Sequence, residues 1–169
     1  AQTATAGNYD VIVANIVGKV TSAVAAVKVN VPVAITVQPA GGALNPGASK
    51  TLSVSATGTA PLAYQWRRAG IALEGGTAAS YTVLNAQSAN VGAYDVVVRN
   101  VVGSVTSQPA VVTVNLPVSI LTQPVSQSVN PGADVVFSVS ATGTPPMTYQ
   151  WRKGGVPLQG ATGVSFALS

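Results

Sequence analysis

Apolar and polar residues alternate along most of the chain with a period of two, which predicts β-strands rather than helices. Leu52, Val54 and Ala56 alternate with two serines and are expected to face one side of a strand. Two further inward sets follow from the same alternation: Leu62, Tyr64, Trp66 and Tyr94, Val96, Val98. Turn-forming Gly, Pro and Asn residues separate these segments, and short strands at such spacing indicate an all-β sandwich or barrel. Residues 85–91 are expected to form one helical turn at most.

The pattern repeats with a fixed period of 85 residues. Tyr-Gln-Trp-Arg occurs at residues 64–67 and again at residues 149–152, and we call this spacing the repeat period. The segment at residues 92–98 has its counterpart at residues 7–13, one repeat period earlier. Fixed-period self-similarity is typical of tandem units. We therefore expect one complete unit and two partial ones: residues 1–31 with the last strands of a split unit, residues 33–115 as the complete unit, and residues 118–169 with the first strands of a split unit.

The two junctions between the expected units share one proline each, Pro32 and Pro117, and lack a Gly/Ser tract. Proline fixes its own backbone angle φ and biases the preceding residue toward extended conformations. We expect short, stiff linkers that restrict the angle between neighbouring units, since flexible linkers are rich in Gly and Ser.

The composition of the chain argues against two classes of partner, membranes and nucleic acids. Hydrophobic residues make up 47% of the chain and charged residues 7%, with a net charge of +4. No apolar run approaches the roughly 18 residues that a membrane helix needs, so no membrane span is expected. Basic residues pair only at residues 67–68 and 152–153, which we interpret as solvated strand ends rather than a nucleic-acid surface. A surface glycan remains open as a partner.

The chain offers little chemistry for catalysis. It contains no Cys and no His, which excludes disulfides and thiolate metal sites. No pair of carboxylates can be argued into an acid–base site, and a Ser or Thr nucleophile would lack a base. We expect no enzyme activity, no cofactor and no metal site, calcium included. The acidic residues are Asp10, Glu74, Asp95 and Asp134.

Val54, then Trp66 twelve residues later, then Tyr94 in a Gly-x-Tyr strand form a set that resembles the immunoglobulin-like fold. The resemblance is to the intermediate-set type found as cysteine-free tandem repeats in large bacterial surface or secreted proteins. It implies that Val54 and Val96 occupy the two disulfide positions of the family and pack beside Trp66. It also implies that the hydroxyls of Tyr94 and Tyr9 bond to backbone a few residues upstream. A bacterial, extracellular or cell-surface location is implied as well, which the composition favours.

The two partial units predict a head-to-tail assembly. A sandwich that lacks two strands exposes unpaired edges and an apolar groove, and the segments 1–31 and 119–169 together come close to the length of one 85-residue unit. We expect the C-terminal part of one copy to be completed by the N-terminal hairpin of the next, giving a homopolymeric extracellular filament. The alternative is a set of spacer or binding repeats in a large bacterial adhesin or secreted multidomain protein, and whether copies are separate chains stays open. The residues expected to complete the split unit are Tyr9, Val11, Val13, Phe137, Val139, Trp151 and Phe166.

The tips of two expected hairpins carry apolar residues where a solvated turn prefers polar ones. Ile16 and Val17 occupy one tip, and Val101 and Val102 occupy the equivalent tip of the complete unit. Repeated apolar residues at the same place mark a candidate contact surface. These four residues are therefore candidate lateral contacts.

Overall fold

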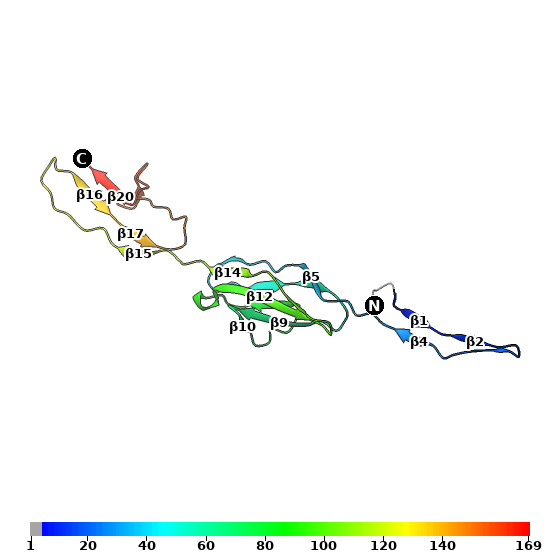
Figure 1. Cartoon of the computed structure of the whole chain (residues 1–169). Helices are drawn as coiled ribbons and strands as arrows, with labels where there is room; N and C mark the ends of the chain where they lie inside the picture. The colour runs from blue at the N-terminus through cyan, green and yellow to red at the C-terminus, as the bar shows by residue number, and fades with distance from the viewer. Residues whose placement is uncertain (1–4) are drawn as a thin grey trace.

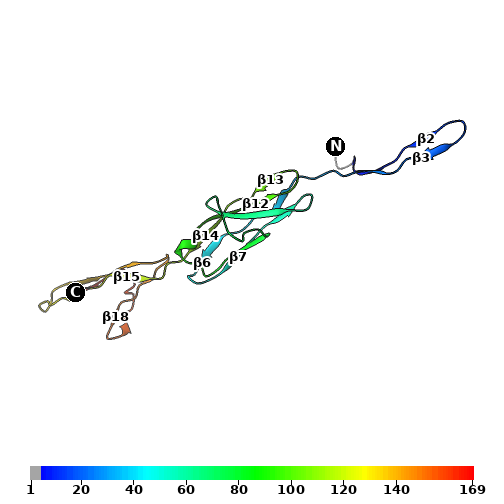
Figure 2. The ribbon, with the colours of Figure 1, turned by 90° about the horizontal axis from the view of Figure 1, so that it is seen from below.

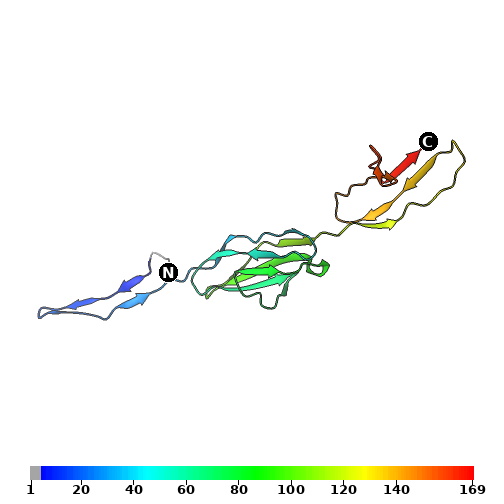
Figure 3. The same cartoon turned by 180° about the vertical axis from the view of Figure 1, so that it is seen from behind.

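The chain forms an elongated row of three parts, as a computed structural model that describes residues 5–169 shows (Figure 1). A hairpin lies at one end, a β-sandwich in the middle and an open, partly paired sheet assembly at the other end. The views in Figures 2 and 3 agree that the hairpin and the open assembly lie on opposite sides of the sandwich. The described residues of the two outer parts therefore do not contact each other within one chain.

The central sandwich contains two layers. One is a six-stranded sheet of order β10-β9-β12-β14-β6, with β13 pairing β12; its pairs are antiparallel except for the parallel pair β14–β6. The other contains the antiparallel pairs β11–β7 and β5–β8. The elements are β5 (Ala34–Val37), β6 (Gly42–Leu44), β7 (Lys50–Ser53), β8 (Ser55–Thr57), β9 (Ala63–Arg68), β10 (Ile71–Ala72), β11 (Ser80–Val83), the 3-10 helix η2 (Ser88–Asn90), β12 (Gly92–Arg99), β13 (Ser104–Thr106) and β14 (Ala110–Val114).

The alternating apolar sets form the core of this sandwich. Val54 and Val96 come from opposite layers and belong to one buried cluster with Trp66, as the resemblance predicted. The Trp66 indole is fully buried and its Nε1 donates a 2.9 Å hydrogen bond to the carbonyl of Ala78. The remaining members of the cluster are Leu52, Val83, Ala86, Tyr94, Val98, Ala110 and Val112. The one helical turn expected near residues 85–91 is η2.

The N-terminal hairpin repeats the end of the sandwich. Tyr9 pairs with Ala25, just as Tyr94 pairs with Ala110, so the register is the same after a shift of one repeat period. The Tyr9 hydroxyl donates to the Thr5 carbonyl at 2.8 Å, and the Tyr94 hydroxyl makes the same bond to Asn90. The upstream backbone bond expected of both tyrosines is therefore present. The strands are β1 (Gly7–Tyr9), β2 (Ile12–Ala14), β3 (Lys19–Thr21) and β4 (Ala25–Val27).

The C-terminal part repeats the start of the sandwich. Phe137 pairs with Phe166 between β16 and β20, as Leu52 pairs with Tyr81 between β7 and β11. The pair β15–β17 also reproduces the register shift seen in β5–β8. The strands are β15 (Ser119–Thr122), β16 (Val135–Ser138), β17 (Ser140–Thr142), β18 (Arg152–Lys153), β19 (Val156–Pro157) and β20 (Ser165–Leu168).

Each junction is fixed by the same pair of hydrogen bonds. The Val31 amide donates to Thr59 Oγ1 at 2.7 Å, and the Thr59 amide donates back to the Val31 carbonyl at 3.0 Å. At the second junction Leu116 and Thr144 make the same two bonds, at 2.6 and 3.0 Å. These two junction clamps tie each linker to a turn of the following unit, in agreement with the stiff linkers expected from sequence. Within residues 5–169, no helix is long and apolar enough to cross a membrane.

Candidate interaction surfaces

One face of the N-terminal hairpin consists of core-type residues without a core. The side chains of Tyr9, Val11 and Val13 are 51%, 55% and 61% exposed, whereas their counterparts in the central sandwich are at most 2% exposed. These counterparts, each one repeat period further along, are Tyr94, Val96 and Val98. The hairpin thus presents to solvent the surface that β12 buries.

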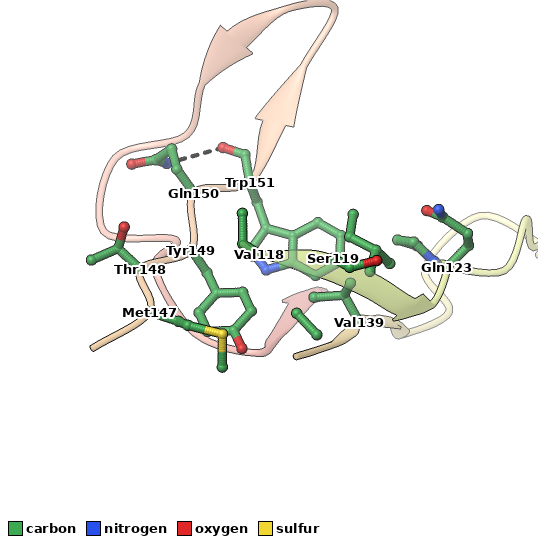
Figure 4. Close-up of a pocket in the computed structure, with 12 residues that line it drawn as sticks. Val118, Ser119, Gln123, Val139, Met147, Thr148, Tyr149, Gln150 and Trp151 are labelled. Atoms are coloured by element: carbon green, nitrogen blue, oxygen red, sulfur yellow. Dashed lines mark hydrogen bonds between the residues drawn. The ribbon is translucent and has the colours of Figure 1, made fainter. Parts of the chain in front are cut away.

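The C-terminal part presents the complementary surface. A groove of about 560 Å³ is lined by the half-buried side chains of Val139, Tyr149 and Trp151 (Figure 4). A second groove, of about 550 Å³, lies along Trp151 with Phe137 and Phe166. Trp151 is only half-buried, although its counterpart in the central sandwich is fully buried. We refer to this face, defined by Phe137, Val139, Tyr149, Trp151 and Phe166, as the open face.

The open face is bordered by backbone that lacks strand partners. Residues 148–151 are not a strand, although the equivalent residues 63–66 lie in β9 and pair with β12. Residues 127–129 are also not a strand, although residues 42–44 form β6 and pair with β14. In the central sandwich, β12 and β14 lie between β9 and β6. Within the described residues, the C-terminal part therefore contains no strands equivalent to β12 and β14, which the N-terminal hairpin resembles.

The aromatic rings show how the two surfaces match. Trp151 lies with its ring centroid 6.2 Å from that of Phe137 and 6.1 Å from that of Phe166. In the central sandwich Tyr94 stacks on Tyr81 at 6.3 Å. The counterpart of Tyr81 on the open face is Phe166, so a hairpin docked in the equivalent position would place Tyr9 on that ring.

One position departs from this match. A Cβ on Gly41 would lie 1.9 Å from the carbonyl oxygen of Val111, so only glycine fits there. The equivalent residue one repeat period later is Ser126, which carries a Cβ. The backbone around Ser126 must therefore follow a different path if a strand equivalent to β14 lies beside it.

An ion pair joins β9 to β12. Arg67 Nε lies 2.7 Å from Asp95 Oδ1, and both side chains are partly exposed. The hydrogen bond to Asp95 holds the pKa of Arg67 above its ordinary value, against a smaller opposing effect of desolvation. Sequence analysis assigned Arg67 to a solvated strand end and missed this contact. The contact follows from the register, which places Asp95 directly opposite Arg67 and which alternation alone does not specify.

The hairpin tips are open in the single chain. Ile16 and Val17 are 104% and 89% exposed, and Val101 and Val102 are exposed as well. Asn15 and Asn100 close the two tips in the same way, with Oδ1 accepting from two backbone amides in each tip. Two backbone amides of each tip are thus satisfied by the asparagine side chain, and the apolar side chains of the tip are left to solvent.

The titratable groups do not gather into a chemical site. Among residues 5–169, no group of three or more Asp, Glu, His or Cys side chains could hold a metal ion. The acids Asp10 and Asp95 occupy equivalent positions in different parts of the molecule. The arrangement therefore presents two matching apolar surfaces: the exposed face of the hairpin at one end and the open face at the other.

Comparison with known proteins supports the fold. No protein-family model matches the chain. Curated relatives include Roundabout homolog 1 of Mus musculus and of Homo sapiens, each 30% identical over an alignment that covers 89% of this chain and 10% of the relative. The chain thus spans about a tenth of the length of these relatives.

Solved structures agree. Titin domains I67–I69, as an E-to-A mutated variant, match with a TM-score of 0.67 and 19% identity over 94% of this chain and 59% of that one. Sidekick-1 immunoglobulin domains 1–5 match with a TM-score of 0.61 and 22% identity over 93% of this chain and 37% of that one. Drosophila OTK, extracellular domains 3–5, matches with a TM-score of 0.51 and 21% identity over 94% of this chain and 56% of that one. The chain is an all-β array of tandem immunoglobulin-like units.

Proposed function

We propose that the chain is a structural, non-enzymatic element of an extracellular or cell-surface filament, in which the hairpin of one copy completes the open face of the next. The observation that carries this proposal is the register within each part. After a shift of one repeat period, the hairpin pairs its strands as β12 and β14 do, and the C-terminal part pairs its strands as β7 and β11 do. Each surface alone leaves apolar side chains in water, which is unfavourable by about 25 cal/mol per Å².

Geometry supports propagation rather than closure. The hairpin and the C-terminal part that carries the open face lie at opposite ends of the elongated chain (Figure 3). A contact between two different surfaces is heterologous, and when it cannot close on itself it generates an open filament. Main-chain pairing with residues 148–151 would supply affinity, as in other cases of strand addition.

The extracellular and bacterial setting is part of the same proposal. It rests on the low charge, the absence of cysteine and the resemblance to bacterial tandem repeats. The Drosophila structure named above consists of extracellular domains of that protein.

Engineered cysteines test the proposal directly, because the natural chain has none. Val11 and Val139 stand at the positions equivalent to Val96 and Val54, which occupy the disulfide positions of the fold. The variant Val11→Cys/Val139→Cys is expected to form disulfides between copies under mild oxidation. Non-reducing gel electrophoresis should then show a ladder of covalent multimers that collapses with thiol.

Two controls make the result specific. Val54→Cys/Val96→Cys should form its disulfide within one chain and run as a monomer. Ile12→Cys/Val139→Cys displaces one thiol to the opposite face of the strand and should give no ladder above background. The proposal is wrong if the Val11/Val139 variant gives no ladder and the natural chain sediments as a monomer at every concentration tested.

The alternative function is a spacer array in a large adhesin or secreted multidomain protein. The junction clamps favour it, since repeated rigid junctions set a fixed distance between units along one polypeptide. In that case the open face would be completed by a following stretch of the same polypeptide with the sequence pattern of residues 7–29. Monomeric behaviour of the 169-residue chain in the cross-linking test would select this alternative.

The hairpin tips are proposed as lateral contacts in the assembly. Replacing Ile16 and Val17 by Ser should leave the hairpin folded, because Asn15 still accepts both backbone amides of the tip. Loss of the apolar contact should weaken assembly by at least about 100-fold if both side chains are buried there, given about 1.5–3 kcal/mol for each buried aliphatic side chain and about 1.4 kcal/mol per factor of ten. Sedimentation velocity over a concentration series measures this, and unchanged assembly would remove the tips from the interface.

A further inference from the structure

Polar side chains join the closing hairpin of the central sandwich, residues 92–115, to the strands that precede it. They cross the same boundary that lies between copies in the assembly proposed above. The contacts are the ion pair of Arg67 with Asp95, the hydrogen bonds from Asn100 Nδ2 to the carbonyls of Val31 and Thr59, the bond from the Gln108 amide to Gln38 Oε1, and the bond from Asn115 Nδ2 to Asn45 Oδ1.

Every group that these contacts use recurs one repeat period away. Each side chain that donates or accepts in these contacts has the same residue type at the equivalent position. Some residues contribute only a main-chain amide or carbonyl, and at those positions a different side chain leaves the hydrogen-bonding group unchanged. The equivalent pairs are Asp10 with Arg152, Asn15 with Leu116 and Thr144, Ala23 with Gln123, and Asn30 with Asn130.

The charged residues show that this retention is selective. Of the eight basic and four acidic residues of the chain, only Asp10, Asp95, Arg67 and Arg152 have the identical residue at the equivalent position of the repeat. Arg68 and Lys153 keep a basic charge at equivalent positions, and each of the remaining charged residues meets an uncharged residue there. The one oppositely charged pair kept in both copies of the repeat is therefore the pair that bridges β9 and β12 in the central sandwich.

The equivalent polar groups at the two ends of the chain do not make these contacts within a single copy. Asp10 lies between β1 and β2, and Arg152 lies in β18, on the opposite side of the sandwich from β2 (Figure 2). Within residues 5–169, neither has an ion-pair partner. Asn15 uses Oδ1 to close its tip, and its Nδ2 makes no hydrogen bond to the described part of the chain.

We propose that a polar latch sets the register of the hairpin on the open face of a second copy: an Asp10–Arg152 ion pair, with Asn15 Nδ2 donating to the carbonyls of Leu116 and Thr144. This inference rests on the head-to-tail assembly proposed above and names the groups that make it specific. The partner is a second copy of this chain, because its hairpin carries both the apolar face and the matching charge.

A latch is needed because the apolar face cannot choose a register by itself. Tyr9, Val11 and Val13 repeat every two residues, so a slip of two residues keeps all of them facing the core. Such a slip moves Asp10 by about 6.6 Å along the strand, at about 3.3 Å per residue, and separates it from Arg152. The ion pair thus distinguishes the correct register from its nearest competitor.

Charge reversal tests the latch. Asp10→Arg and Arg152→Asp should each weaken association about 10- to 100-fold, since each juxtaposes like charges at the interface. The double variant should recover most of the affinity, and an equimolar mixture of the two single variants should assemble by alternation. Asn15→Asp, which keeps the tip acceptor and removes the donors, should also weaken association. Sedimentation velocity at low and high salt measures the effects, which should shrink with salt.

The controls separate the latch from the assembly and from folding. The melting transition of the central sandwich should be unchanged in every variant, because neither Asp10 nor Arg152 contributes to it. If the natural chain assembles and the reversals leave association unchanged, the latch is wrong and the head-to-tail assembly stands. If single reversals weaken association but the double variant and the mixture do not recover it, the two residues do not pair. If the natural chain does not assemble, both proposals fail.

Discussion

Trp66→Ala is expected to destabilise the central sandwich by about 3–5 kcal/mol, the range for removing a large buried aromatic side chain. The indole is fully buried at the centre of the core cluster, and its removal also leaves the Ala78 carbonyl without its donor. Domains of this size are stabilised by only about 5–15 kcal/mol, so a large share of the stability is lost. Denaturant unfolding followed by circular dichroism measures the change.

Trp151→Ala is the matched control. Trp151 has the same sequence neighbours, but it lies on the open face and is only half-buried in the single chain. We expect no change in the unfolding of the central sandwich and a loss of head-to-tail association. A loss below about 1 kcal/mol for Trp66→Ala, small for a buried aromatic side chain, would contradict the central role of that indole.

Val11→Asn is expected to abolish association while leaving the central sandwich intact. In the assembly Val11 would occupy the fully buried position of Val96, and a buried amide without a partner costs about 1–3 kcal/mol in addition to the lost apolar contact. The sum corresponds to a loss of affinity of at least about 100-fold, at about 1.4 kcal/mol per factor of ten. Sedimentation of the variant against the natural chain gives the number directly.

Ile12→Asn controls for polarity alone. Ile12 is the next residue along the chain and faces the opposite side of the strand, at the position of the half-buried Val97. It should affect association much less than Val11→Asn. Equal effects of the two variants would mean that the hairpin does not dock through the face of Tyr9, Val11 and Val13.

Much of the fold follows from side-chain alternation, because alternation assigns each residue to a face. The inward positions of Leu52, Val54 and Trp66, the packing of Val96 beside them and the Tyr94 hydroxyl bond all agree with the structure. The repeat period also predicted that the N-terminal part resembles the last strands of the sandwich and that the C-terminal part resembles its first strands, and the structure gives each part the matching register.

Pairing between strands was harder to infer, because alternation does not specify which residues lie opposite each other. The Arg67–Asp95 ion pair depends on the register of β9 with β12, which sequence analysis did not derive. The junction clamp at Thr59 was missed for a related reason, since a threonine in a turn gives no sign that it bonds to a residue 28 positions earlier. A position-by-position comparison of the repeats does single out these residues, because Arg67, Asp95 and Thr59 each have the identical residue at the equivalent position.

The parallel pair β14–β6 has a mechanical consequence. The linkers enter and leave the central sandwich next to its first and last strands, and the strand nearest the exit, β14, runs beside β6 in the same direction. Tension applied through both linkers pulls these two strands in opposite directions along their axes. Their hydrogen bonds are then loaded together in shear rather than opened one at a time, so the unit resists traction along the long axis of the molecule.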